Sequence, residues 1–155
     1  MPMWCSYTAL ETSGFFRYES FKKKMLPWLD LICFDIKLID EADSKQYTGR
    51  SNKRILSNFS RLLSDAARIP VIPRIPLIPG ITTTKENLAG IAAFLNDQGI
   101  KTCELMPYNP LWLDKLQKLG ITPRYRRTSF MTPAEQQACV DSFTQHSPME
   151  KKHAN

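Results

Sequence analysis

The chain alternates short apolar runs with longer stretches in which apolar residues recur every three or four positions. The strand-like runs are 7–15, 31–37, 69–81 and 101–108, and the helix-like stretches are 19–30, 51–68, 83–99 and 132–146. The run LICFDIK at 31–37 is almost continuously apolar, which is typical of a strand buried on both faces. Strands that alternate with helices of this length favour parallel βαβ units. We therefore expect an α/β fold with about four parallel strands and flanking helices.

Local signals set the expected helix boundaries. Pro27 breaks the first helical stretch, and Ser51 is a candidate N-cap for the second. Gly99 ends the third as a C-cap, while Thr132 and Pro133 form an N-cap and a first-turn proline for the last.

The segment IPVIPRIPLIP at 69–79 is the hardest part of the pattern to interpret. Its prolines recur every three residues, the period of a polyproline II helix. Because proline cannot donate to a sheet ladder, a central strand is disfavoured. A proline-rich linker is one interpretation, but the intervening residues are too apolar to remain solvated. A distorted strand beside an irregular or open part of a barrel fits better.

Length and composition indicate one globular domain. The 155 residues with 43% hydrophobic content allow one core of moderate size. We expect residues 1–146 to form the domain and 147–155 to be a polar tail that frays. The sequence shows neither a membrane-spanning run nor a signal peptide, so we expect a cytoplasmic protein.

Cysteine spacing and charge narrow the function classes. The four cysteines, Cys5, Cys33, Cys103 and Cys139, are scattered, which favours reduced thiols over two disulfides. None of their spacings indicates a zinc or iron–sulfur site. Cys33, in a predicted buried strand, is most simply a small core residue. The net charge of +6 comes from basic residues spread along the chain. Nucleic-acid binding is therefore disfavoured, although an anionic protein partner or a negatively charged cofactor would also suit the charge.

Polar residues cluster where the predicted strands end. They are Glu11, Thr12, Asp35, Lys37, Arg74, Glu104, Tyr108 and Asn109. The carboxyl ends of parallel strands build the sites of α/β folds, so these residues should converge on one rim. The two-residue period places Asp35 and Lys37 on one face, where they would suit a zwitterionic ligand or form an ordinary salt bridge. The others also have structural explanations when taken singly. Arg74 could extend to solvent, Glu11 and Thr12 could form a capped turn, and Asn109 could be a turn residue.

Five ordered stretches give the sequence a family resemblance: ALETSGF (9–15), LPWLDLICFDIK (26–37), YTGRSNKRIL (47–56), RIPLIPGI (74–81) and ELMPYNPLWLDKLQKLG (104–120). From about Ala9 to Phe143 the chain resembles the C-terminal half of radical S-adenosylmethionine enzymes that activate glycyl-radical enzymes, the pyruvate formate-lyase activating enzyme family. This implies the last four strands of a partial (β/α)6 barrel. It also implies a [4Fe-4S] cluster, reductive cleavage of S-adenosylmethionine to a 5′-deoxyadenosyl radical, and hydrogen abstraction from a glycine of a partner enzyme.

The resemblance also assigns cofactor-binding residues. Asp35 and Lys37 match the motif that contacts the ribose and the methionine carboxylate, and Arg74 matches an arginine that faces the cofactor. Glu11 and Thr12 match positions near the methionine end, where a cation could be shared with Asp35. The stretch that packs on adenine is matched by Met106, Tyr108 and Asn109, with Asn109 standing where many members have His.

The cluster motif C-x-x-x-C-x-x-C and the following G-G-E motif do not occur in the sequence. We therefore expect a truncated or split activating enzyme that is inactive alone and pairs with a separate N-terminal half bearing the cluster. Two other hypotheses remain at this point. One is a non-catalytic half-barrel binding module or decayed gene product, and the other an unrelated α/β enzyme that uses Asp35 and Lys37 as an acid–base pair.

Overall fold

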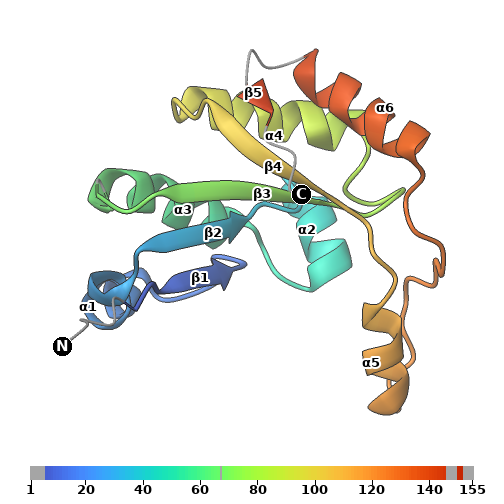
Figure 1. The fold of residues 1–155 in the computed structure, drawn as a ribbon, viewed down its shortest axis with the longest axis horizontal. Helices are drawn as coiled ribbons and strands as arrows, with labels where there is room; N and C mark the ends of the chain where they lie inside the picture. The colour runs from blue at the N-terminus through green and yellow to red at the C-terminus, as the bar shows by residue number, and fades with distance from the viewer. Residues whose placement is uncertain (1–5, 67, 146–149, 152–155) are drawn as a thin grey trace.

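Parallel strands form a single sheet in the order β1-β2-β3-β4-β5 (Figure 1). The computed structural model describes residues 6–66, 68–145 and 150–151. The strands are β1 Ala9–Thr12, β2 Leu31–Asp35, β3 Val71–Leu77, β4 Thr102–Pro107 and the short β5 Glu150–Lys151. The expected α/β partial barrel with about four parallel strands is confirmed, with β5 added at the edge beside β4.

The helices connect successive strands. They are α1 Tyr18–Lys24, the 3-10 turn η1 Leu26–Trp28, α2 Glu41–Thr48, α3 Lys53–Asp65, α4 Lys85–Asp97, α5 Trp112–Lys118 and α6 Pro133–Thr144. Figure 1 shows α3 and α4 against one side of the sheet, whereas α5 extends away from it. None of the helices in the described part of the chain is both long and apolar enough to cross a bilayer.

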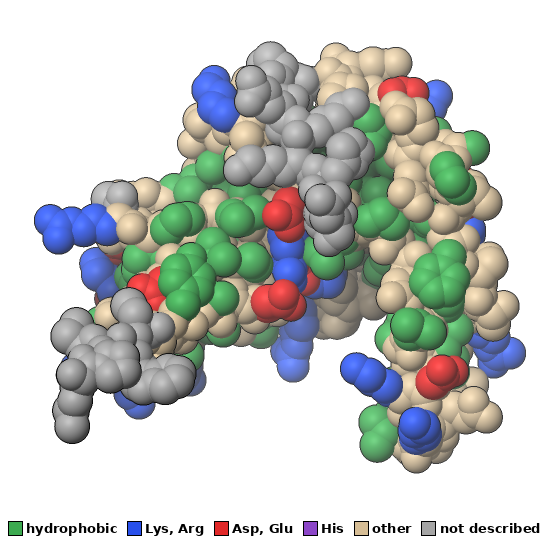
Figure 2. Space-filling model, in the orientation of Figure 1, with side chains coloured by type: hydrophobic (Ala, Val, Ile, Leu, Met, Phe, Trp, Pro, Cys, Tyr) green, Lys and Arg blue, Asp and Glu red, His purple; other side chains and the backbone are tan. Residues whose placement is uncertain are grey.

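The core lies between the sheet and the helices on one face. Ile32 and Phe34 of β2 and Ile75 of β3 are fully buried there. The ring of Phe34 meets that of Phe59 from α3 edge to face, with centroids 5.1 Å apart. Figure 2 shows the opposite face, where acidic and basic side chains interrupt a mostly hydrophobic surface. The polar residues of the site therefore lie on the face that these helices leave uncovered.

Gly14, in the turn after β1, is required by both conformation and space. Its φ is +76°, a left-handed value that side chains disfavour. A Cβ at this position would also lie 2.1 Å from Cζ of Phe34. The glycine therefore lets the chain turn directly over the core at the end of β1.

Helix boundaries largely follow the sequence signals. Thr132 caps α6 in a capping box with Glu135, as its N-cap assignment predicted, and Gly99 has a left-handed φ of 73° just beyond α4. The Ser51 N-cap prediction was wrong, because Asn52 occupies that position. The Ser51 hydroxyl instead accepts a hydrogen bond from the Lys53 amide.

The prediction that the proline-rich segment avoids a central position was wrong. Strand β3 pairs with β2 on one side and with β4 on the other. Successive residues of a parallel strand direct their backbone groups to opposite neighbours, so a proline removes one donor and leaves the carbonyls available. The carbonyls of Pro70 and Arg74 indeed accept hydrogen bonds from Ile32 and Ile36.

Three further elements differ from the sequence expectations. Helices α2 and α5 were not predicted. Helix α2 has no continuous apolar stripe and depends on its ends, where the Asp40 carboxylate caps the first turn and Gly49 closes the last. Part of the tail expected to fray forms β5, while 146–149 and 152–155 lie outside the described residues.

Candidate functional site

An ionic network joins the carboxyl ends of three strands. Arg74 of β3 donates from Nη1 to Glu11 of β1 at 2.7 Å and from Nε to Oδ1 of Asp35 on β2 at 3.0 Å. The other Asp35 oxygen, Oδ2, accepts a hydrogen bond from the Lys37 ammonium at 3.0 Å. The structure therefore joins four of the five charged residues predicted for this rim, and the fifth is Glu104.

Burial and pairing control the protonation of this network. Arg74 is only 9% exposed, and its hydrogen bond to Glu11 raises the pKa of its guanidinium despite the opposing effect of burial. The same hydrogen bond lowers the pKa of Glu11 below its ordinary value. Arg74 thus stays charged, and its hydrogen bond favours the ionised form of Glu11.

Strand register explains why these residues meet. Asp35 is opposite Arg74, and Arg74 is opposite Glu104, so the three side chains share one face of the sheet. Cys33 lies on this same face, opposite Ile72, and is half buried. Its interpretation as a core residue was therefore wrong, since the core occupies the other face. Burial still raises the pKa of its thiol.

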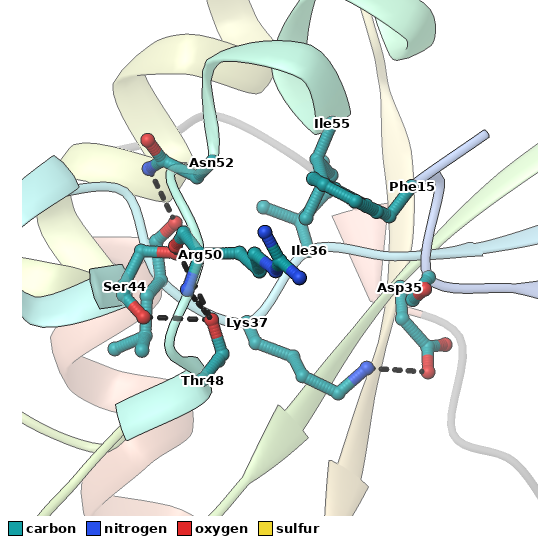
Figure 3. Close-up of a pocket in the computed structure, with 11 residues that line it drawn as sticks. Phe15, Asp35, Ile36, Lys37, Ser44, Thr48, Arg50, Asn52 and Ile55 are labelled. Atoms are coloured by element: carbon teal, nitrogen blue, oxygen red, sulfur yellow. Dashed lines mark hydrogen bonds and ion pairs between the residues drawn. The ribbon is translucent and has the colours of Figure 1, made fainter. Parts of the chain in front are cut away.

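A cavity of about 260 Å³ opens beside Asp35 and Lys37 (Figure 3). Its lining combines Phe15 and Ile55 with the polar residues Ser13, Ser44, Thr48, Arg50 and Asn52. Figure 3 shows Lys37 directed toward Asp35 and the side chain of Arg50 entering the same space. An apolar wall with a few converging charges is the usual composition of a small-molecule site.

A second cavity of about 840 Å³ adjoins the first, and Lys37, Leu38 and Thr48 line both. Its aromatic lining comprises Tyr47, Tyr108, Trp112 and Tyr125. Tyr108 is buried and packs edge to face on Tyr125 at 5.4 Å between ring centroids. This volume lies within the range of cavities that enclose whole small ligands.

The remaining predicted residues have structural contacts of their own. The Thr12 hydroxyl accepts a hydrogen bond from the Gly14 amide, and Thr12 pairs with Phe34, on the face away from Arg74. Asn109 accepts from the Leu111 amide in a turn. Met106 is in register with Pro76 and shares the face of Arg74. Thus Met106 joins the site face, whereas Thr12 and Asn109 serve turns.

Two buried asparagines near the site were missed by the sequence analysis. Asn87 of α4 donates to the carbonyl of Lys37 and accepts from the amide of Ile39, both at 2.9 Å. Asn52 donates to the carbonyls of Leu38 and Ile39. Their only sequence signal was an amide residue near a helix start, which usually indicates a cap.

The residues fit S-adenosylmethionine but not an iron–sulfur cluster. Asp35 can accept hydrogen bonds from a diol, and Lys37 can pair with a carboxylate. Both lie beside cavities of suitable size. In the described part of the chain, no group of three or more His, Cys, Asp or Glu residues could hold a metal ion. The cation suggested for Glu11 and Asp35 is not needed, because the Arg74 guanidinium lies between these carboxylates.

Comparison with known proteins connects this site to a family. No protein-family model matches the chain. It is 37% identical over 109 residues to isethionate sulfite-lyase activating enzyme of Nitratidesulfovibrio vulgaris, an alignment that covers 70% of the chain and 35% of that protein. Over 132 residues it is 33% identical to trans-4-hydroxy-L-proline dehydratase activating enzyme of Clostridioides difficile, covering 84% and 42%. Over 125 residues it is 31% identical to pyruvate formate-lyase 2-activating enzyme of Escherichia coli, covering 79% and 41%.

A solved structure matches the fold over nearly the whole chain. It is a domain of pyruvate-formate lyase-activating enzyme from Bacteroides vulgatus, with a TM-score of 0.69 over 96% of this chain and 81% of that one. At 22% sequence identity this similarity supports the fold alone.

Fold and rim together define an α/β partial barrel of parallel strands whose carboxyl ends carry a network of charged side chains. The chain is a homologue of the glycyl-radical enzyme activating enzymes, which confirms the family resemblance of its sequence motifs. It spans between 35% and 42% of the length of the relatives described above.

Proposed function

We propose that this chain supplies the S-adenosylmethionine-facing strands of a glycyl-radical enzyme activating enzyme. The observation that carries the proposal is the network of Glu11, Arg74, Asp35 and Lys37 at the strand ends, beside two adjoining cavities. The resemblance of its motifs to radical S-adenosylmethionine enzymes supports a ligand that has a diol at one end and an amino acid at the other.

Each rim residue has a role that follows from its contacts. Asp35 can accept hydrogen bonds from the hydroxyl groups of a ribose, while Lys37 can form an ion pair with a carboxylate. Arg74 does not reach for the ligand in this proposal; it holds the side chains of Asp35 and Glu11 in place. Bound S-adenosylmethionine would supply the adenosyl group from which activating enzymes generate the radical that removes hydrogen from a glycine.

Cluster ligands must come from outside the printed sequence. Its cysteines form no C-x-x-x-C-x-x-C motif, and the described thiols Cys33, Cys103 and Cys139 lie on separate elements. We therefore place the cluster motif on a further segment, either of a longer protein or of a second polypeptide. Thiols free of disulfides among the described residues agree with a reducing compartment such as the cytoplasm.

The partner in this proposal is a glycyl-radical enzyme. The matched relatives are named for activating isethionate sulfite-lyase, trans-4-hydroxy-L-proline dehydratase and pyruvate formate-lyase 2. These names do not favour the alternative of a non-catalytic binding module or that of an unrelated acid–base enzyme. The three relatives differ in the enzyme that each is named for activating.

Calorimetric titration of the chain with S-adenosylmethionine tests the proposal. We expect saturable binding that Asp35→Asn and Lys37→Met each weaken about tenfold or more, since each removes a charge-assisted contact. Lys45→Gln, which removes an exposed lysine paired with Glu41 on α2, is the control and should bind normally. Wild-type protein that is folded but shows no binding would refute the proposal.

A further inference from the structure

Arg50 is a second cation facing the cavity beside Asp35 and Lys37, and the sequence motifs gave it no role. Figure 3 shows its side chain running into the cavity between Phe15 and Lys37. The lining contains one carboxylate, Asp35, and two cations, Lys37 and Arg50. The cavity therefore has one unit of positive charge in excess, which favours an anionic ligand group.

Existing contacts do not use the charge of Arg50. Within the described ranges its guanidinium takes part in no ion pair, whereas Lys37 and Arg74 both bind Asp35. Asp35 already has a cationic partner on each oxygen, Lys37 on Oδ2 and Arg74 on Oδ1. An anion in the cavity could thus bind the guanidinium of Arg50. It could also bind the ammonium of Lys37, whose partner Asp35 is shared with Arg74.

The backbone that carries each cation is held by buried polar side chains. The Ser44 hydroxyl, 3% exposed, donates to the Arg50 carbonyl at 2.8 Å, and Thr48 makes a second contact to the same oxygen. Asn87 holds the carbonyl of Lys37, and Asn52 holds the two carbonyls that follow it. Fixed backbones reduce the ordering cost when the two side chains close on a ligand.

We infer that Arg50 adds a second cation to the carboxylate contact expected of Lys37, and that Arg50 thereby selects ligands that carry an α-carboxylate. A planar guanidinium can bind both oxygens of a carboxylate, which a lysine ammonium alone cannot do with the same geometry. This inference rests on the proposed function for the identity of the ligand. It adds a specificity-determining residue from the loop between α2 and α3, outside the strand ends.

Two ligands that differ only in the carboxylate provide the test. We expect Arg50→Gln to weaken calorimetric binding of S-adenosylmethionine about tenfold or more. Binding of decarboxylated S-adenosylmethionine should be weaker than that of S-adenosylmethionine in the wild type and unchanged by the substitution. The matched control is Arg54→Gln, a nearby exposed arginine that stacks on Phe15 at 4.9 Å without lining the cavity. Equal effects on both ligands, or equal effects of the two substitutions, would overturn the inference.

A probe without the adenosyl group separates this inference from the proposed function. Titration with sodium acetate, followed through the arginine Nε resonances, should shift Arg50 in the wild type and lose its effect in Lys37→Met. Acetate binding without S-adenosylmethionine binding would refute the proposed function and support the anion subsite. Absence of any acetate effect on Arg50 would overturn the subsite itself.

Discussion

Arg74 holds a full positive charge on a side chain that is only 9% exposed, in the middle strand of the sheet. Such a charge is stable because two carboxylates, from β1 and β2, neutralise it at 2.7 and 3.0 Å. Removing one partner of a buried pair leaves an uncompensated charge, which costs far more than losing an exposed pair.

Replacing Arg74 by methionine should therefore destabilise the fold by about 3 kcal/mol, because Asp35 keeps its burial and loses its main partner. Urea unfolding followed by circular dichroism measures this difference. Lys45→Gln, which breaks an exposed i,i+4 pair on α2, should cost no more than about 0.5 kcal/mol. Equal losses for the two variants would show that the rim network contributes little to stability.

Strand β3 shows how a proline-rich segment can remain in a sheet. At its carboxyl end, the hydroxyl of Thr82 donates to the Pro76 carbonyl at 2.5 Å and accepts from the Ile78 amide at 2.6 Å. Thr82 is 1% exposed. A side chain thus supplies hydrogen bonds at the end of β3, beyond the point where the pairing with β2 stops.

Thr82→Val should destabilise the protein by about 2 kcal/mol, because it leaves one buried donor and one buried acceptor without partners. Thr82→Ser, which keeps the hydroxyl and loses one methyl group, should cost about 1 kcal/mol. Thermal or urea unfolding of both variants checks the order. A larger loss for serine than for valine would contradict the hydrogen-bonding role.

Sequence patterns predicted the elements with strong periodicity and missed those that depend on their ends. The four main strands and the long helices follow from apolar spacing, whereas α2 depends on the Asp40 cap and Gly49. The charged rim was predictable because the carboxyl ends of parallel strands meet at one edge of the sheet, so polar residues that follow them converge. The roles of Asn52 and Asn87 were not predictable. These side chains bind loop carbonyls that are distant in the sequence, and no sequence pattern marks such a contact.

The basic surface of the molecule is divided among local ion pairs. Lys22 pairs with Asp65, Lys45 and Lys53 with Glu41, and Arg127 with Glu135. Each of these pairs sets a cation beside a carboxylate, so this part of the basic charge is balanced locally.

Stability should fall from the centre of the sheet to its β1 edge. Strand β3 has neighbours on both sides and contains the fully buried Ile75, whereas β1 pairs only with β2 and alternates exposed and half-buried residues. Hydrogen exchange read by mass spectrometry should show β3 amides exchanging most slowly and β1 amides fastest among the four long strands. Protection of β1 equal to that of β3 would indicate that another segment or chain covers the edge.

The bond between Glu11 and Arg74 has a mechanical consequence, because it joins β1 to β3 past the intervening β2. Among the described residues, no ion pair ties these strands together at their amino ends. If a force pulled β1 away from β3, the strands would separate first at their amino ends. The ionic rim at their carboxyl ends would separate last. The ionic rim would then act as a hinge, keeping the ligand-facing ends aligned while the rest of the edge opens.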